Sequence, residues 1–231
     1  ALSSAASDVY KRQLISQAKE QLFKALKENS MEYIVLPDQA TETGAVQTMR
    51  DAEKCAALFR EHSAEIGGVI VCMPNFGEEA PIFHSIKLAG LDVPVLVQAC
   101  DDEDDKLSLD ERRDSFCGKI SVCNNLYYGG IKFSLTSLHT CALDSEAFAK
   151  DLRKFSKVCE VVYAMRHARI GLIGMRPDPF RTVRFSEKIL QRSGVTTCVA
   201  DLSELIAAAK RMDDTARIAE YMDKIREYGS I

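Results

Sequence analysis

The stretch Gly67-Gly-Val-Ile-Val-Cys-Met-Pro74 decides the fold, because it is a continuous apolar run that ends in a loop. A second run of this kind, Val93–Ala99, follows a helical segment that begins near Pro81, a residue suited to the first turn of a helix. Strands that are apolar on both faces lie in parallel sheets with helices on either side. The two runs therefore predict a parallel sheet of the α/β class.

The same alternation of helices and apolar runs extends in both directions along the chain. Apolar residues at helical spacing predict helices around residues 14–26, 46–59, 112–126 and 148–162, while a short run at 33–36 and a segment at 132–137 stand where strands are expected. We predict a flavodoxin-like, doubly wound α/β domain. Its first strand is central in the common 2-1-3-4-5 order, so its apparent absence would leave two neighbouring strands with unpaired backbone groups.

The chain is predicted to contain three parts. Residues 1–13 are small and polar, unlike the amphipathic segment after them, and we set them apart as a non-native-looking segment. Residues 14–165 form the N-terminal α/β domain. Residues 166–231 begin a second α/β domain, with a strand at 170–173, a helix through residue 190, a strand at 196–199 and helices from 203 to 228.

Composition excludes several classes of function. The 30 basic and 34 acidic residues are interspersed and give a net charge of −4, so no basic stripe for nucleic acid is present. No apolar run approaches the roughly 18 residues that span a bilayer. The N-terminus has no secretion pattern, and most of the eight cysteines lie in apolar segments without a Cys-x-x-Cys pair, so we expect free thiols and a cytoplasmic protein.

Candidate binding residues follow the carboxyl ends of the strands, where ligands gather in open parallel sheets. In the loop after the deciding strand, Asn75 offers a polar contact, Phe76 an apolar platform, and Gly77 a close backbone approach. The alternative is an ordinary strand-to-helix turn, in which Glu78 and Glu79 complement a helix N-terminus.

The next loop contains the acidic run Asp101-Asp-Glu-Asp-Asp105, which lacks the spacing of a calcium loop, so we interpret it as solvated. Arg112, Arg113 and Asp114 behind it are better candidates for binding, because their charged and bidentate groups suit a ligand rich in hydrogen-bonding oxygens. A salt-bridged helix start is the alternative. His139 follows a later strand, but a lone histidine without a carboxylate partner is interpreted as structural.

The segment Arg169-Ile-Gly-Leu-Ile-Gly-Met-Arg-Pro-Asp-Pro-Phe180 runs from a strand into a turn. It lacks the third glycine of a dinucleotide-binding fingerprint, and its prolines stiffen the turn. Arg176 in this turn can bind an anion or a sugar hydroxyl, or pair with an acidic neighbour.

Together with Glu111-Arg-Arg-Asp-Ser-Phe-Cys-Gly-Lys-Ile-Ser-Val-Cys-Asn-Asn-Leu-Tyr-Tyr-Gly-Gly130, this segment resembles the N-terminal half of the L-fucose isomerase family, whose architecture L-arabinose isomerase shares. The resemblance runs from about Leu14 to the C-terminus. It implies a cytoplasmic, homo-oligomeric enzyme that interconverts aldoses and ketoses with Mn²⁺. It also implies that the metal ligands and catalytic residues lie beyond Ile231, so that this chain is a fragment, inactive alone, that supplies oligomer contacts and part of the monosaccharide pocket.

Two other functions stay open. A non-catalytic module that binds a sugar or another small ligand fits two α/β units without a convincing acid–base pair. A flavodoxin-like nucleotide binder fits the fold, but the sequence shows no glycine-rich phosphate loop.

Overall fold

The computed structural model describes residues 5–108 and 111–229, and the chain divides into two compact units, Ala1–Tyr163 and Ala164–Ile231. The first unit contains a parallel sheet in the order β1 (Val69–Met73), β2 (Val95–Ala99), β3 (Ser134–Leu135). In the second unit β4 (Arg169–Ile173) pairs in parallel with β5 (Thr196–Ala200). The predicted α/β class with parallel strands is confirmed.

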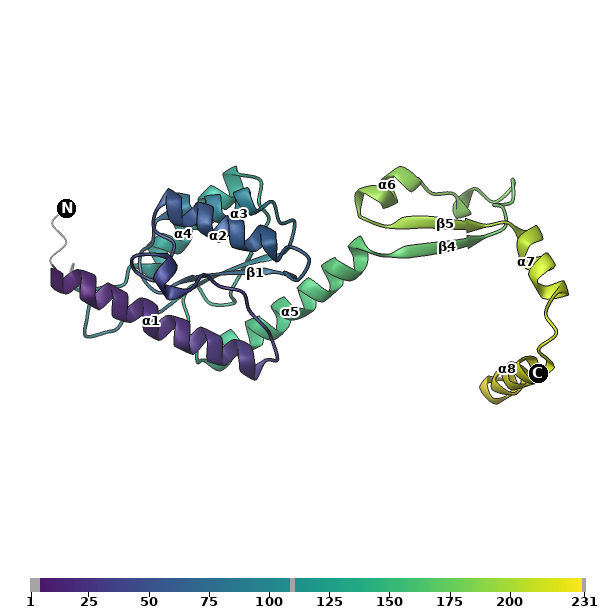
Figure 1. Cartoon of the computed structure of the whole chain (residues 1–231), viewed down its shortest axis with the longest axis horizontal. Coiled ribbons are helices and arrows are strands. Elements are labelled where there is room, and N and C mark those ends of the chain that lie inside the picture. Colours follow the sequence, from purple (N-terminus) through teal and green to yellow (C-terminus); the bar gives the residue numbers. More distant parts are fainter. Residues whose placement is uncertain (1–4, 109–110, 230–231) are drawn as a thin grey trace. The chain divides into compact units, whose positions relative to one another are not determined.

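Helices cover both faces of the first sheet (Figure 1). One face carries α1 (Ala5–Glu28) and α5 (Glu146–Arg166), and the other carries α2 (Met49–Glu61), α3 (Glu79–Ala89) and α4 (Ser115–Tyr128). A short 3₁₀ turn, η1 (Asp38–Ala40), lies in the connection between α1 and α2. The first unit is therefore a three-layer α/β/α arrangement.

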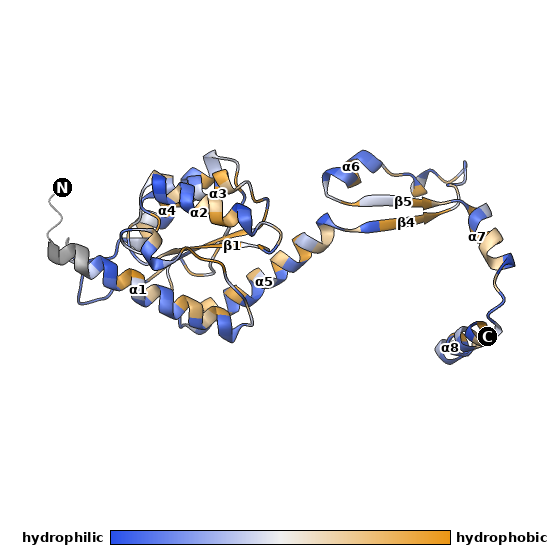
Figure 2. Cartoon of the chain, viewed as in Figure 1, coloured by the Kyte–Doolittle hydropathy of each residue, from blue (hydrophilic) through white to orange (hydrophobic). Residues whose placement is uncertain are grey.

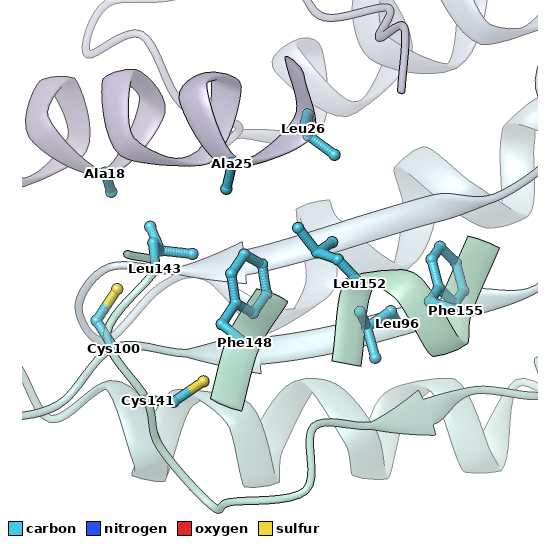
Figure 3. Close-up of a cluster of buried hydrophobic side chains, with 10 residues drawn as sticks. All are labelled: Ala18, Ala25, Leu26, Leu96, Cys100, Cys141, Leu143, Phe148, Leu152 and Phe155. Atoms are coloured by element: carbon cyan, nitrogen blue, oxygen red, sulfur yellow. The ribbon is translucent and has the colours of Figure 1, made fainter. Parts of the chain in front are cut away.

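Two buried clusters hold these layers together, and the strands feed both because successive side chains point to opposite faces. Leu96 joins the cluster under α1 and α5, whereas Val95 and Val97 join the one under α2, α3 and α4. Figure 3 shows the first cluster, in which α1 and α5 contribute most of the side chains: Ala18, Ala25, Leu26, Phe148, Leu152 and Phe155.

Local sequence sets several helix boundaries. Thr48 and Asp51 form a capping box at the start of α2, with Thr48 Oγ1 accepting from the Asp51 N–H at 3.1 Å and the Asp51 carboxylate accepting from the Thr48 N–H at 3.0 Å. The apolar spacing predicts that this helix begins at Arg112. Asp114 has a left-handed backbone (φ 50°), however, so α4 begins at Ser115.

Two expected strands differ from the prediction. Residues Tyr33–Leu36 form no strand, since no strand of the described residues pairs with them. The segment expected to be a strand at 132–137 is reduced to Ser134–Leu135, which pairs with Leu96 and Val97 of β2.

The segment set apart at residues 1–13 falls partly in α1, which begins at Ala5; residues 1–4 lie outside the described part of the chain. Helix α1 buries Leu14 and Ile15 directly after that segment.

The second unit also contains η2 (Arg181–Val183), α6 (Glu187–Arg192), α7 (Leu202–Lys210) and α8 (Thr215–Tyr228). Asp201 and Asp214 cap α7 and α8 by accepting backbone N–H groups. This unit leaves many apolar side chains exposed, and Figure 2 shows hydrophobic colour along β4. Among the described residues, no helix is long and apolar enough to cross a membrane.

Candidate functional site

The carboxyl ends of β1 and β2 bring two of the predicted loops into contact. The loop after β1 contains Asn75, Phe76 and Gly77, and the loop after β2 ends at Arg112, Arg113 and Asp114. The N–H of Phe76 donates to the carbonyl of Arg113 at 2.6 Å. Six of the seven residues predicted to bind a sugar therefore lie on two joined loops.

Arg113 holds the two loops together from within. Its guanidinium contacts a carboxylate oxygen of Glu103 at 2.5 Å and donates to the carbonyl of Pro74 at 3.4 Å. Asp102 accepts the N–H of Arg113 at 2.8 Å. Hydrogen bonds from Lys106 and then Arg113 hold the pKa of Glu103 below its ordinary value. The acidic loop, expected to be solvated, is partly tied to its own basic neighbours.

Helix α4 comes unusually close to the loop after β1, and Gly118 makes this possible. A Cβ at this position would lie 3.0 Å from Met73 Cε, 3.2 Å from the Gly77 nitrogen and 3.3 Å from Phe76 Cα. The glycine thus fixes how deeply the first turn of α4 sits beneath the loop.

Four predicted residues at this junction differ in their exposure and in their hydrogen-bond or ion-pair partners. Asn75 is only 8% exposed, and its side chain makes no hydrogen bond with other described residues. Phe76 is half exposed. Arg112 and Asp114 are paired through Nε and Oδ2 at 2.7 Å. A buried amide beside an exposed ring is suited to a ligand with both hydroxyl groups and an apolar face.

A buried lysine near the third loop was not singled out from the sequence. Lys119 is 3% exposed and donates from Nζ to Thr136 Oγ1 and to the His139 carbonyl, both at 2.8 Å. Burial lowers the pKa of Lys119. His139 is exposed, and its ring lies 5.2 Å from that of Phe116, between ring centroids. The signal for Lys119 was a cation among the apolar positions of a helix.

Three cysteines gather at the same end of the sheet. Cys72 and Cys100 share a hydrogen bond, which lowers the pKa of the Cys100 thiol to about 7 and raises that of Cys72. Gln98 donates to the Cys141 carbonyl at 2.8 Å beside them. All eight cysteines are free thiols, as expected.

Arg176 lies in the second unit. Its guanidinium pairs with Glu187 at 3.0 Å and stacks 4.2 Å from the centroid of the Phe185 ring. The acidic partner, one of the alternatives for this residue, is therefore present.

The described residues offer no group of three or more His, Cys, Asp or Glu side chains placed to hold a metal ion. Of the carboxylates at the junction, Asp114 is paired with Arg112, Asp102 accepts the N–H of Arg113, and Glu103 contacts Arg113 and Lys106.

Comparison with known proteins identifies the family of the chain. No match is found among the curated proteins. The family model of the N-terminal domain of fucose/sulfoquinovose isomerase matches residues 4–166, which include both joined loops and the whole first sheet. Because this match covers more than half of the chain, the protein belongs to the fucose/sulfoquinovose isomerase family.

Proposed function

We propose that this chain forms the N-terminal part of a cytoplasmic aldose–ketose sugar isomerase and contributes part of its monosaccharide pocket and its homo-oligomer contacts. The family match over residues 4–166 supports this proposal most strongly. The junction of the two loops at the carboxyl ends of β1 and β2 supplies the location.

We assign four roles to the residues of this junction. The amide of Asn75, a residue that is only 8% exposed, pairs with a sugar hydroxyl, because it makes no hydrogen bond with other described residues. The exposed Phe76 ring packs against the C–H face of the sugar. The Arg112–Asp114 pair presents charged hydrogen-bonding groups at the rim, while Arg113 positions the loops.

Manganese does not fit the described residues of this chain. A hard divalent cation needs several oxygen ligands converging on one point, and the carboxylates near the junction are engaged by Arg113, Lys106 and backbone N–H groups. In this proposal the metal and the groups that move the proton between C1 and C2 belong to another part of the enzyme, and this chain alone has no isomerase activity.

A chimera tests the proposal. In an active fucose isomerase of the family, the N-terminal domain is replaced by residues 4–166 of this chain, and isomerisation is assayed with added Mn²⁺. We expect activity, and we expect Asn75→Ala to raise KM with little change in kcat, because the lost contact serves binding. Asn124→Ala on the exposed face of α4 is the matched control.

Unchanged kinetics in a correctly assembled Asn75→Ala chimera would contradict the assignment of this residue. The second candidate function, a non-catalytic sugar-binding module, is favoured by the lack of a metal cluster among the described residues. It would be supported by a chimera that assembles and binds L-fucose but does not convert it.

A further inference from the structure

The exposed side of α4 carries no charge. The helix spans 14 residues, Ser115–Tyr128, and its one charged residue, Lys119, is buried. The residues that it exposes are aromatic, aliphatic or uncharged and polar: Phe116, Cys117, Ile120, Asn124, Tyr127 and Tyr128. Tyr127 is 73% exposed and Tyr128 is 81% exposed. The solvent-facing side of a helix is normally polar and charged, so this composition is typical of a surface that meets a partner.

Strand β3 extends this surface at the edge of the sheet. Leu135 stands opposite Val97 in the parallel register, so both side chains point to the face of the sheet that α4 covers. Leu135 nevertheless stays more than half exposed, as does Leu138 in the loop after β3. Among the described residues, no strand pairs with the outer edge of β3. The apolar surface thus continues from the helix to an open sheet edge.

Buried polar groups hold the loop after β3 in place beneath its exposed side chains. From α4, Lys119 Nζ donates to Thr136 Oγ1 and to the His139 carbonyl. From α5, the Asp151 carboxylate accepts the N–H of Ser137 at 2.8 Å and its hydroxyl at 3.0 Å. A loop that is already fixed loses little conformational freedom when a partner binds, which favours association.

We propose that the exposed side of α4 and the adjoining β3 segment form a contact with a second copy of this chain. The apolar residues of this edge patch are Phe116, Ile120, Tyr127, Tyr128, Leu135 and Leu138. The inference rests on the homo-oligomer contacts of the proposed function and assigns them to one surface. The cores of protein interfaces are enriched in tyrosine and phenylalanine and depleted in charged residues, as the edge patch is.

The size of the edge patch agrees with a dimer contact. Its three aromatic residues alone expose on the order of 400 Å², since an aromatic side chain can bury about 150–250 Å². With its aliphatic residues, the edge patch approaches the roughly 800 Å² that each partner buries in a standard interface. A symmetric contact through this surface therefore has the area that a stable dimer needs.

Electrostatics favours a second copy as the partner. The chain carries a net charge of −4, so two copies repel each other over much of their surfaces. The edge patch brings no charge of its own to the contact, so this repulsion is lowest there. About a two-fold axis perpendicular to α4 the two helices are antiparallel, and the positive end of each helix dipole faces the negative end of the other.

Sedimentation equilibrium of the complete 231-residue chain over a series of concentrations tests the proposal. We expect a monomer–dimer equilibrium that Ile120→Lys weakens by about a hundredfold or more, because the contact would bury a lysine without a carboxylate partner. Leu88→Lys, at a partly exposed position of α3 outside the edge patch, is the matched control and should leave the equilibrium unchanged. Asn124→Ala adds no charge to α4 and should also leave it unchanged.

Two further measurements make the result specific. Tyr127→Lys, which also places a charge in the edge patch, should weaken the dimer as Ile120→Lys does, and it replaces that variant if circular dichroism shows Ile120→Lys to be unfolded. Raising the NaCl concentration from about 0.1 M to about 1 M should not weaken the dimer, because salt screens ion pairs and leaves apolar contacts intact.

A dimer that persists in both lysine variants would overturn the assignment to the edge patch, whereas the homo-oligomer contacts of the proposed function would stand. A chain that stays monomeric at every concentration would overturn both. A dimer that dissociates at about 1 M NaCl would also overturn the assignment, because ion pairs outside the edge patch would then hold the two copies together.

Discussion

At the scale of single residues, Thr41 allows the energetic cost of a buried hydroxyl without a hydrogen-bond partner among the described residues to be measured. Thr41→Val replaces the hydroxyl by a methyl group of similar size, so the free energy of unfolding should rise by about 1 kcal/mol. Thr43→Val is the matched control, because Thr43 Oγ1 donates to Gln47 Oε1 at 2.9 Å. The loss of this hydrogen bond should lower the free energy of unfolding. Urea denaturation measures both, and equal effects of the two substitutions would contradict the expectation.

Gly118 sets how closely α4 approaches the loop after β1. Alanine is favoured over glycine in a helix by about 1 kcal/mol, yet its Cβ would press on the backbone of Phe76 and Gly77. We expect Gly118→Ala to lower stability by about 1–3 kcal/mol as an overpacked site and to weaken sugar binding in the chimera. Asn124→Ala on the same helix should not destabilise; a stabilised Gly118→Ala variant with normal binding would refute this account.

The residue types at the site could be predicted from the sequence, but their hydrogen-bond and ion-pair partners could not. Asn75 and Phe76 could be located from the sequence because they follow an apolar strand directly. Arg113 contacts Glu103 and Pro74, whereas Arg112 pairs with Asp114. These contacts depend on the left-handed backbone at Asp114, which apolar spacing does not reveal. The burial of Lys119 depends on contacts with a loop that lies 17 to 20 residues away in the chain.

At the scale of elements, the loop after β2 should loosen in acid. The pKa of Glu103 is lowered from 4.5 in the folded state, so its contribution to stability is full above that pH and is lost as the pH falls through the lowered value. Glu103→Gln removes this dependence. We expect the stability difference between the parent and this variant to shrink below about pH 4.5, as measured by urea denaturation across the acid range.

Asp104→Asn, at an exposed position of the same loop, is the control for a general loss of negative charge. A constant difference between the parent and Glu103→Gln across this pH range would show that the contact of Glu103 with Arg113 and Lys106 is not what the acid disrupts.

Elements with their own periodicity were predicted well, and elements that need a neighbour were not. The long helices and the strands β1 and β2 follow from apolar spacing within one segment. Tyr33–Leu36 has the composition of a strand but no adjacent ladder, so it stays irregular. The β3 segment pairs with β2 over only two residues, an extent that apolar spacing within the segment does not reveal.

At the scale of the whole molecule, the alternation of helices and strands indicated two α/β units, but it could not show how unequally they are packed. Both buried clusters consist of residues between Ala18 and Phe155. In the described part of the second unit, Val195 is the one hydrophobic side chain that is buried. Periodicity predicts which face of an element is apolar, but burial depends on the presence of a second layer to cover it.

The unequal packing of the two units predicts that the first unit is equally stable without the second. A shortened chain of residues 1–166 keeps both buried clusters and all of α5, so its urea midpoint, followed by circular dichroism, should match that of the complete chain. Leu152→Ala removes a fully buried side chain from the first cluster and should lower the free energy of unfolding by about 2–5 kcal/mol. The urea midpoint should therefore fall by the same amount in both chains. A lower midpoint of the shortened chain would show instead that residues 167–231 stabilise the first unit, and the two units would then have to be treated as one folding unit.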